Sequence, residues 1–201
     1  MKIICIGRNY ANHAKEMKSD IPTEPVFFMK PDTALLKEGD FYLPDFSKEM
    51  HHEIELVIKI CKSGKHIAEQ FAHKYYEEIG LGIDFTARDL QAQCKAQGLP
   101  WEKAKAFDNS APIGMFVNKN ELNLKNIEFE LKINGVSKQL GHSSDVIFSF
   151  DKIIAYVSQF VTLKMGDLIY TGTPEGVGPV KIGDKLEGFM NGKSMLHLNI
   201  R

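Results

Sequence analysis

The chain has 201 residues, of which 43% are hydrophobic and 25% are charged, and its formal net charge is -1 at pH 7. This is the composition of an ordinary globular protein, and the length fits a single domain over residues 1–201. The balanced charge gives no reason to expect nucleic acid or an anionic membrane as a partner.

Cysteine content and the amino terminus bear on the compartment. Cys5, Cys61 and Cys94 are odd in number and form no C-x-x-C pair, which argues against a disulfide framework or a zinc ribbon. The mostly apolar run before Gly7 is too short for a signal-peptide core or a membrane span. We therefore expect a cytoplasmic protein.

The first half of the chain alternates short apolar runs with segments of helical composition. Asn9 or Asn12 is a candidate cap for the first helix, and Gly98 with Pro100 ends the third. We expect strands at residues 2–6, 26–29 and 80–84, helices at residues 9–18, 68–79 and 86–97, and loops from residue 31 to residue 50.

Residues 52–61 give the clearest strand pattern in the sequence. Ile54, Leu56 and Ile58 alternate with polar side chains, as in a strand with one buried and one polar face. Glu53 and Glu55 then share a face, because residues i and i+2 of a strand point the same way.

The second half is rich in β-type sequence, interrupted by one helix at residues 150–160. Turn dipeptides such as Asn134-Gly135 separate the runs, and Asn191-Gly192 predicts a hairpin of residues 185–190 and 193–200. We expect an α+β fold dominated by β-structure, either a sheet sandwich or a roll.

Three carboxylates form the first candidate site. Glu53 and Glu55 repel each other unless a cation lies between them, and Asp84 follows an apolar strand that delivers it from the core. Carboxylates without Cys or His favour Mg²⁺ or Mn²⁺ over Zn²⁺. The alternatives are a solvated strand face for the glutamates and a helix cap for Asp84.

His13 and Glu16 form the second candidate site. At i and i+3 of a helix they share a face, so the carboxylate can orient the imidazole as a general base. The alternative is a solvated helix face in a segment rich in Lys, Asn and Glu.

Residues 170–178, Y-T-G-T-P-E-G-V-G, form the third candidate. Glycines allow close backbone approach to a ligand, and Thr171 and Thr173 supply hydroxyls. The segment matches neither a Walker A loop nor a dinucleotide fingerprint. Lys105, which precedes this segment in the chain, is either a cation for an anionic substrate or an ordinary surface lysine.

Six motifs in register resemble the fumarylacetoacetate hydrolase family, and most closely its small acylpyruvase and oxaloacetate decarboxylase branch. They are G-R-N-Y-A-x-H-x-x-E at 7–16, F-x-K-P at 28–31, H-H-E-x-E-L at 51–56, D-x-T-A-R-D-x-Q at 84–91, G-L-P-W-x-x-A-K-x-F at 98–107 and T-G-T-P-x-G-V-G-P at 171–179.

The resemblance implies a mixed β-sandwich roll with flanking helices, assembled as a homodimer. It also implies Mg²⁺ or Mn²⁺ as the cofactor, catalysis by His13 and Glu16 with Lys105, and a lid formed by residues 13–25. The implied metal ligands are Glu53, Glu55 and Asp84, and the implied substrate contacts are Arg8, Lys30, Arg88, Gln91 and Thr173.

The expected activity is metal-dependent hydrolysis of acylpyruvates to pyruvate and a carboxylic acid, with oxaloacetate decarboxylation at the same site. His13, oriented by Glu16, would deprotonate the attacking water, while Lys105 and Thr173 would hold the substrate carboxylate and the developing oxyanion. One alternative is a 2-hydroxy-dienoate or diacid isomerase-decarboxylase of aromatic catabolism. The other is a binding module without catalysis.

Overall fold

The computed structural model describes residues 1–16 and 20–201 of the chain. Its largest element is a mixed seven-stranded sheet, in which β1 pairs with β11 and β3 with β8 in parallel, and the other neighbours run antiparallel. In sheet order the strands are β2 (Val26–Lys30), β1 (Ile3–Gly7), β11 (Leu168–Tyr170), β5 (Ile54–Ile60), β6 (Tyr76–Ile83), β8 (Ala111–Asn118) and β3 (Leu35–Leu36).

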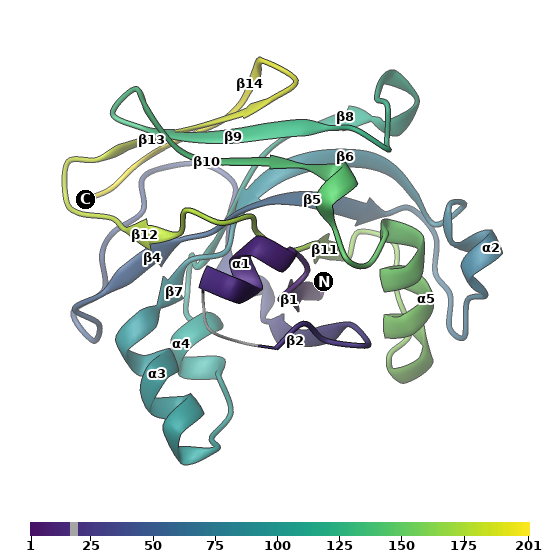
Figure 1. The fold of residues 1–201 in the computed structure, drawn as a ribbon, viewed down its shortest axis with the longest axis horizontal. Helices are drawn as coiled ribbons and strands as arrows, with labels where there is room; N and C mark the ends of the chain where they lie inside the picture. Colours follow the sequence, from purple (N-terminus) through teal and green to yellow (C-terminus); the bar gives the residue numbers. More distant parts are fainter. Residues whose placement is uncertain (17–19) are drawn as a thin grey trace.

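A second, antiparallel sheet packs on the first (Figure 1). Its strands, in order, are β10 (Val136–His142), β9 (Glu128–Ile133), β13 (Lys185–Met190) and β14 (Lys193–Asn199). One hydrophobic core joins the two sheets, with Ile54 and Leu81 on one side and Phe129, Leu131 and Leu196 on the other. The protein therefore has the layered, β-rich α+β fold that the sequence predicts.

Short strands and helices surround these sheets (Figure 1). A three-stranded ribbon carries β12 (Gly178–Pro179), β4 (Met50–His52) and β7 (Thr86–Ala87), next to α3 (Arg88–Gln97) and α4 (Glu102–Lys105). On the other side, α2 (Glu69–Ala72) packs on α5 (Phe150–Phe160). The remaining elements are α1 (Ala11–Glu16) and the 3-10 helices η1 (Asp32–Ala34), η2 (Lys119–Glu121) and η3 (Ser143–Asp145).

Several sequence predictions are confirmed closely. Helix α5 occupies residues 150–160 and is capped by Ser149, whose hydroxyl accepts from the Lys152 N–H at 3.2 Å. The hairpin at Asn191-Gly192 is present, and both of its turn residues have positive φ, as a tight two-residue turn requires. Among the described helices, none has the length and apolar character needed to cross a membrane.

The helix predicted at residues 68–79 is wrong. Only residues 69–72 are helical, and β6 begins at Tyr76 because residues 76–79 pair with β5. In that ladder Glu78 lies opposite Lys59, and their side chains form an ion pair of 2.7 Å. Sheet pairing overrides the helical tendency of the local sequence here.

Two other predicted helices are shorter than expected. Helix α1 begins at Ala11 because the buried side chain of Asn9 bonds the backbones of Phe148 and Thr171 rather than capping a helix. Residues 17–18 of that prediction, and residues 17–19 of the predicted lid, lie outside the described residues. Thr86 and Ala87 pair with β4, so α3 starts at Arg88, and it ends at Gln97, where Gly98 with φ +64° forms the C-cap.

Candidate metal centre and active site

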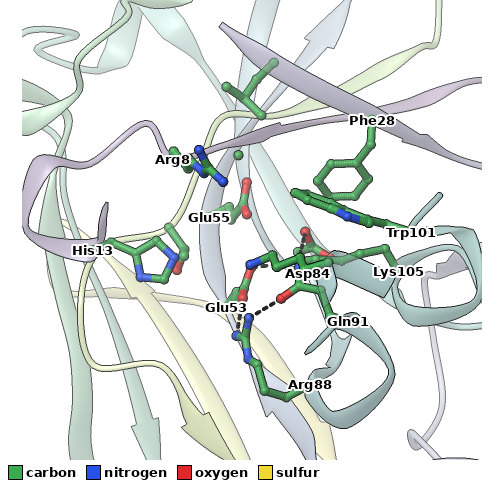
Figure 2. A pocket seen from close by; sticks show the side chains of 14 residues that line it. Arg8, His13, Phe28, Glu53, Glu55, Asp84, Arg88, Gln91, Trp101 and Lys105 are labelled. Atoms are coloured by element: carbon green, nitrogen blue, oxygen red, sulfur yellow. Dashed lines mark hydrogen bonds and ion pairs between the residues drawn. The ribbon is translucent and has the colours of Figure 1, made fainter. Parts of the chain in front are cut away.

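The carboxylates of Glu53, Glu55 and Asp84 meet where β5 begins and β6 ends, at adjoining ends of two neighbouring strands of the large sheet (Figure 2). Oxygen atoms of the three side chains lie within 4.8 Å of one another. Glu53 precedes β5 directly, Glu55 lies in β5, and Asp84 follows β6. The Asp84 N–H donates to the Glu53 carbonyl at 2.8 Å, which fixes the register of the two strand ends.

Burial rules out the structural alternatives for these residues. Strand β5 lies inside the sheet and is buried on both faces, so Glu53 and Glu55, at 5% and 2% exposure, do not form a solvated strand face. Asp84 is not a helix cap, because α3 begins after Ala87 and has no side-chain cap bond. Carboxylates this deeply buried need charged or hydrogen-bonding partners.

Three cations supply most of these partners. The Lys105 ammonium lies 2.8 Å from Glu53 Oε2 and 2.7 Å from Asp84 Oδ2, while Lys30 lies 2.7 Å from Asp84 Oδ1. Arg88 lies 2.5 Å from the other oxygen of Glu53. Lys105 is itself buried, so the interpretation of an ordinary surface lysine is wrong.

Glu55 has no Lys or Arg partner among the residues that the structure describes. Its only hydrogen bond within the described chain comes from the Gly172 N–H at 2.7 Å. Burial, followed by the charges of Asp84 and Glu53, raises the pKa of Glu55 well above its usual value. Burial also opposes ionisation of Glu53, but Lys105 and Arg88 hold the pKa of Glu53 well below its usual value.

This arrangement fits a divalent cation. A buried carboxylate with two like charges beside it, and no protein cation of its own, is stabilised by a metal ion in their midst. The three candidate donors are all carboxylates, which is the chemistry preferred by Mg²⁺ or Mn²⁺.

His13 faces the same pocket from α1 (Figure 2), and Glu16, on the same helix, bonds its imidazole. His13 is 8% exposed, and its Nδ1 lies 3.2 Å from Glu16 Oε2, so the alternative of a solvated helix face does not hold for the imidazole. Glu16 Oε1 also accepts from the Gly176 N–H at 3.1 Å, and the Asn12 amide donates to Glu175 at 3.2 Å. These contacts hold α1 against the loop of residues 171–178.

Most of the residues predicted for substrate binding line the pocket. Arg8 does so from the left-handed region of the backbone, with φ +59°, which is uncommon for a residue with a side chain. Lys30 does not line the pocket but supports it through Asp84. The full lining is Ile6, Gly7, Arg8, His13, Phe28, Glu53, Glu55, Asp84, Arg88, Gln91, Lys95, Trp101, Lys105 and Thr173.

The sequence interpretation missed Lys95, Phe28 and Trp101. Lys95 lies seven residues after Arg88 and four after Gln91, so the three side chains share one face of α3, and this spacing alone could have identified it. Burial, followed by the charges of Arg88 and Arg8, lowers the pKa of Lys95. In the described part of the chain neither Lys95 nor Arg8 has an acidic partner, so both remain available to an anionic ligand.

Comparison with known proteins gives consistent results. The family model described as fumarylacetoacetate (FAA) hydrolase C-terminal matches residues 2–200. Mitochondrial oxaloacetate tautomerase FAHD1 of Mus musculus is 44% identical over 99% of this chain and 91% of its own length. Oxaloacetate tautomerase YcgM of Escherichia coli K12 is 42% identical over 96% of this chain and 90% of its own.

A solved structure agrees with these relatives. The crystal structure of fumarylpyruvate hydrolase from Pseudomonas aeruginosa, in complex with Mn²⁺ and pyruvate, superposes with a TM-score of 0.94 at 36% identity. The match covers 100% of this chain and 89% of that chain.

Proposed function

From the premise that the chain belongs to the fumarylacetoacetate hydrolase family, we propose that it is a metal-dependent enzyme that interconverts the keto and enol forms of oxaloacetate. The observation that carries this proposal is the buried triad of Glu53, Glu55 and Asp84 with His13 at the same pocket. Tautomerisation needs a charged centre that polarises a carbonyl and one group that moves a proton, and this pocket offers candidates for both.

The triad would hold Mg²⁺ or Mn²⁺. The cation would supply Lewis-acid polarisation of the C2 carbonyl oxygen of the keto acid. The protein side of the pocket then binds the anionic substrate through its cations, since Arg8 and Lys95 have no acidic partner in the described chain. Gln91, Arg88 and Thr173 provide further donors on the pocket wall.

His13 is the candidate for proton transfer. In the keto form a proton leaves C3 of oxaloacetate, and in the enol form the C2 oxygen carries it, so the imidazole must accept the C3 proton and release it again. Glu16 orients the ring through its bond to Nδ1, which leaves Nε2 for the substrate. Lys105, buried beside the triad, donates to the negative charge that develops on oxygen.

Acylpyruvate hydrolysis is the second candidate function. The similarity to fumarylpyruvate hydrolase with bound Mn²⁺ and pyruvate favours it, as does the His13–Glu16 pair, which suits activation of water. Water would add at C4, the C3–C4 bond would break, and C3 would take up a proton to give pyruvate. Oxaloacetate decarboxylation would need no water: the C3–C4 bond would break, C4 would leave as carbon dioxide, and C3 would take up a proton to give pyruvate. The alternative of a diene-diacid isomerase remains a prediction.

One set of assays tests the proposal. Ultraviolet absorbance follows the enol of oxaloacetate, while acetylpyruvate and fumarylpyruvate report hydrolysis, each with Mg²⁺, with Mn²⁺ and with EDTA. We expect fast, metal-dependent ketonisation of oxaloacetate, lost in Glu55→Gln and retained in Glu49→Gln, a matched change of an exposed glutamate. Absence of metal-dependent turnover of all three substrates would refute the proposal, and turnover of acylpyruvates alone would favour the second candidate.

A further inference from the structure

Gln139 is a buried amide that joins two parts of the pocket wall. It lies in β10 at 1% exposure, at a register shift between Ser137 and Gln139. Such a bulge changes the direction of a side chain. The loop of residues 171–178 packs directly against this bulge. A Cβ built at Gly176 would lie only 2.3 Å from the Lys138 carbonyl oxygen.

All four hydrogen-bonding positions of this amide are used. Gln139 Oε1 lies 3.0 Å from the Ile54 N–H, between the two glutamates, and 2.9 Å from His52 Nδ1. Gln139 Nε2 lies 2.8 Å from Thr173 Oγ1 and 3.0 Å from the Pro174 carbonyl.

These partners fix which end of the amide is oxygen. The Ile54 N–H can only donate, and the Pro174 carbonyl can only accept. A flipped amide would therefore oppose donor to donor at Ile54 and acceptor to acceptor at Pro174. It follows that His52 carries its proton on Nδ1 and that Thr173 Oγ1 accepts from Gln139.

The orientation of Gln139 determines where the Thr173 O–H can point. Its oxygen receives the Gln139 proton on one lone pair, so its own O–H must point elsewhere. The described residues offer no acceptor for that proton, and Thr173 lines the pocket at 3% exposure. The hydroxyl is therefore set as a donor to whatever oxygen the ligand brings.

We propose that Gln139 is a positioning residue that holds Thr173 as a hydrogen-bond donor toward a carboxylate or developing oxyanion of the substrate. Because it also binds the Ile54 N–H, it ties the strand of the glutamates to the loop of the hydroxyl. The inference rests on the proposed function for the identity of the substrate but not for the orientation of the amide.

The orientation is tested first in the unmodified protein. ¹⁵N NMR of histidine-labelled protein at pH 7.5 should show His52 as the neutral Nδ1–H tautomer, the less common form of the ring. His52→Gln identifies the signal. An Nε2–H tautomer at His52 would mean a flipped amide and would overturn the proposal without any need for a functional variant.

The function of the amide is tested by a double-mutant cycle. We expect Thr173→Val to weaken oxalate binding, measured calorimetrically with Mg²⁺, about tenfold to hundredfold, and Thr173→Ser to retain most of the affinity. Gln139→Met removes both donors without adding charge and should cause a similar loss. Combined with Thr173→Val it should cause little further loss, because both substitutions abolish the same hydrogen bond, from the Thr173 hydroxyl to the ligand.

The controls separate positioning from folding and from charge. Gln139→Glu still accepts from Ile54 but must draw the Thr173 proton toward itself, so oxalate affinity should fall while Mn²⁺ affinity stays within about threefold. Gln159→Glu makes the same change at an exposed position and should leave the oxalate and Mn²⁺ affinities unchanged. Additive losses at residues 139 and 173 would overturn the proposal. If His52 has the expected tautomer and the substitutions at residues 139 and 173 are coupled, but oxaloacetate is not turned over, then only the proposed function is refuted.

Discussion

At the scale of single residues, the three buried carboxylates of the pocket differ in how their negative charges are compensated. Glu53 and Asp84 each have protein cations at ion-pair distance, whereas Glu55 has a backbone N–H. Lys105 touches Glu53 and Asp84, two of the three candidate metal ligands, so its ammonium shares the same carboxylate groups with the cation that they would hold.

The role of His13 gives the first prediction. His13→Ala should abolish acylpyruvate hydrolysis and reduce oxaloacetate tautomerisation by about a hundredfold or more, because the general base is lost. Mn²⁺ binding should survive, since the imidazole is not a ligand in the proposed site. Steady-state rates and electron paramagnetic resonance of Mn²⁺ measure the two effects. Hydrolysis near the wild-type rate would show that His13 does not act as the base.

The second prediction concerns Lys95. Lys95→Met should raise the KM for oxaloacetate about fivefold, because a partly solvated charge pair contributes about 1 kcal/mol. Inhibition by 2-oxobutanoate, which has a methyl in place of the C4 carboxylate, should change little. Lys103→Met, on the exposed face of α4, is the matched control. An equal effect on both compounds would mean that Lys95 does not recognise the distal carboxylate.

Candidate site residues could be predicted from the sequence where they lie within one short motif. The spacing in E-x-E brings Glu53 and Glu55 to one face, and the structure has them there. Lys30 and Lys105 come from distant segments, so no local pattern reveals that both approach Asp84. Gln139 could not be predicted as part of the site, because the direction of its side chain depends on a β-bulge.

At the scale of elements, prediction succeeded where local sequence and tertiary contacts agree. Helix α5 has a serine cap and one strongly buried face, and its bounds match the expectation. Strand β5 was expected to have a polar face, but neighbours on both sides and a second layer bury it. Residues 76–79 were assigned to a helix because the pairing that makes them a strand involves residues far along the chain.

Helix α3 gives the third prediction. Asp89, in its first turn, accepts from the Ser47 hydroxyl at 2.7 Å and the Lys48 N–H at 3.0 Å. Burial tends to raise the pKa of Asp89, but these bonds hold it below its usual value. A carboxyl group with a lowered folded pKa stabilises the protein above its unfolded pKa of about 3.9 and loses that effect as the pH falls through the folded value.

Asp89→Asn should therefore lower the free energy of unfolding by about 1 kcal/mol at pH 7, and the difference from wild type should shrink as the pH falls below about 4. Urea titrations across that range measure it. Asp108→Asn, at an exposed position, is the control. A difference that stayed constant with pH would show that the carboxylate charge is not the source.

At the scale of the whole molecule, the two sheets lie in close contact at Gly114. A Cβ built there would lie 2.2 Å from the Met195 carbonyl oxygen and 2.9 Å from the Leu196 Cβ, so β8 and β14 leave no space for a side chain. Gly114→Ala should destabilise the protein by about 1–3 kcal/mol, because backbone must move.

Thermal unfolding measures this fourth prediction. Gly178→Ala is its control, since a Cβ there would meet nothing closer than 3.5 Å. Unchanged stability of the Gly114 variant would mean that the sheets separate without cost. This contact could not be predicted from the sequence, because glycine is also common in turns and bulges.

The pairing of β1 with β11 has a consequence for synthesis on the ribosome. Strand β1 can pair with β2 early, but Ile3 lies opposite Leu168 on its other side, so that side of β1 stays unpaired until most of the chain has been made. The acidic triad spans only residues 53–84, and its two strands form a hairpin that emerges far earlier. The carboxylates are thus exposed to cellular cations before Thr173 and the loop that holds α1 exist, and the pocket closes last.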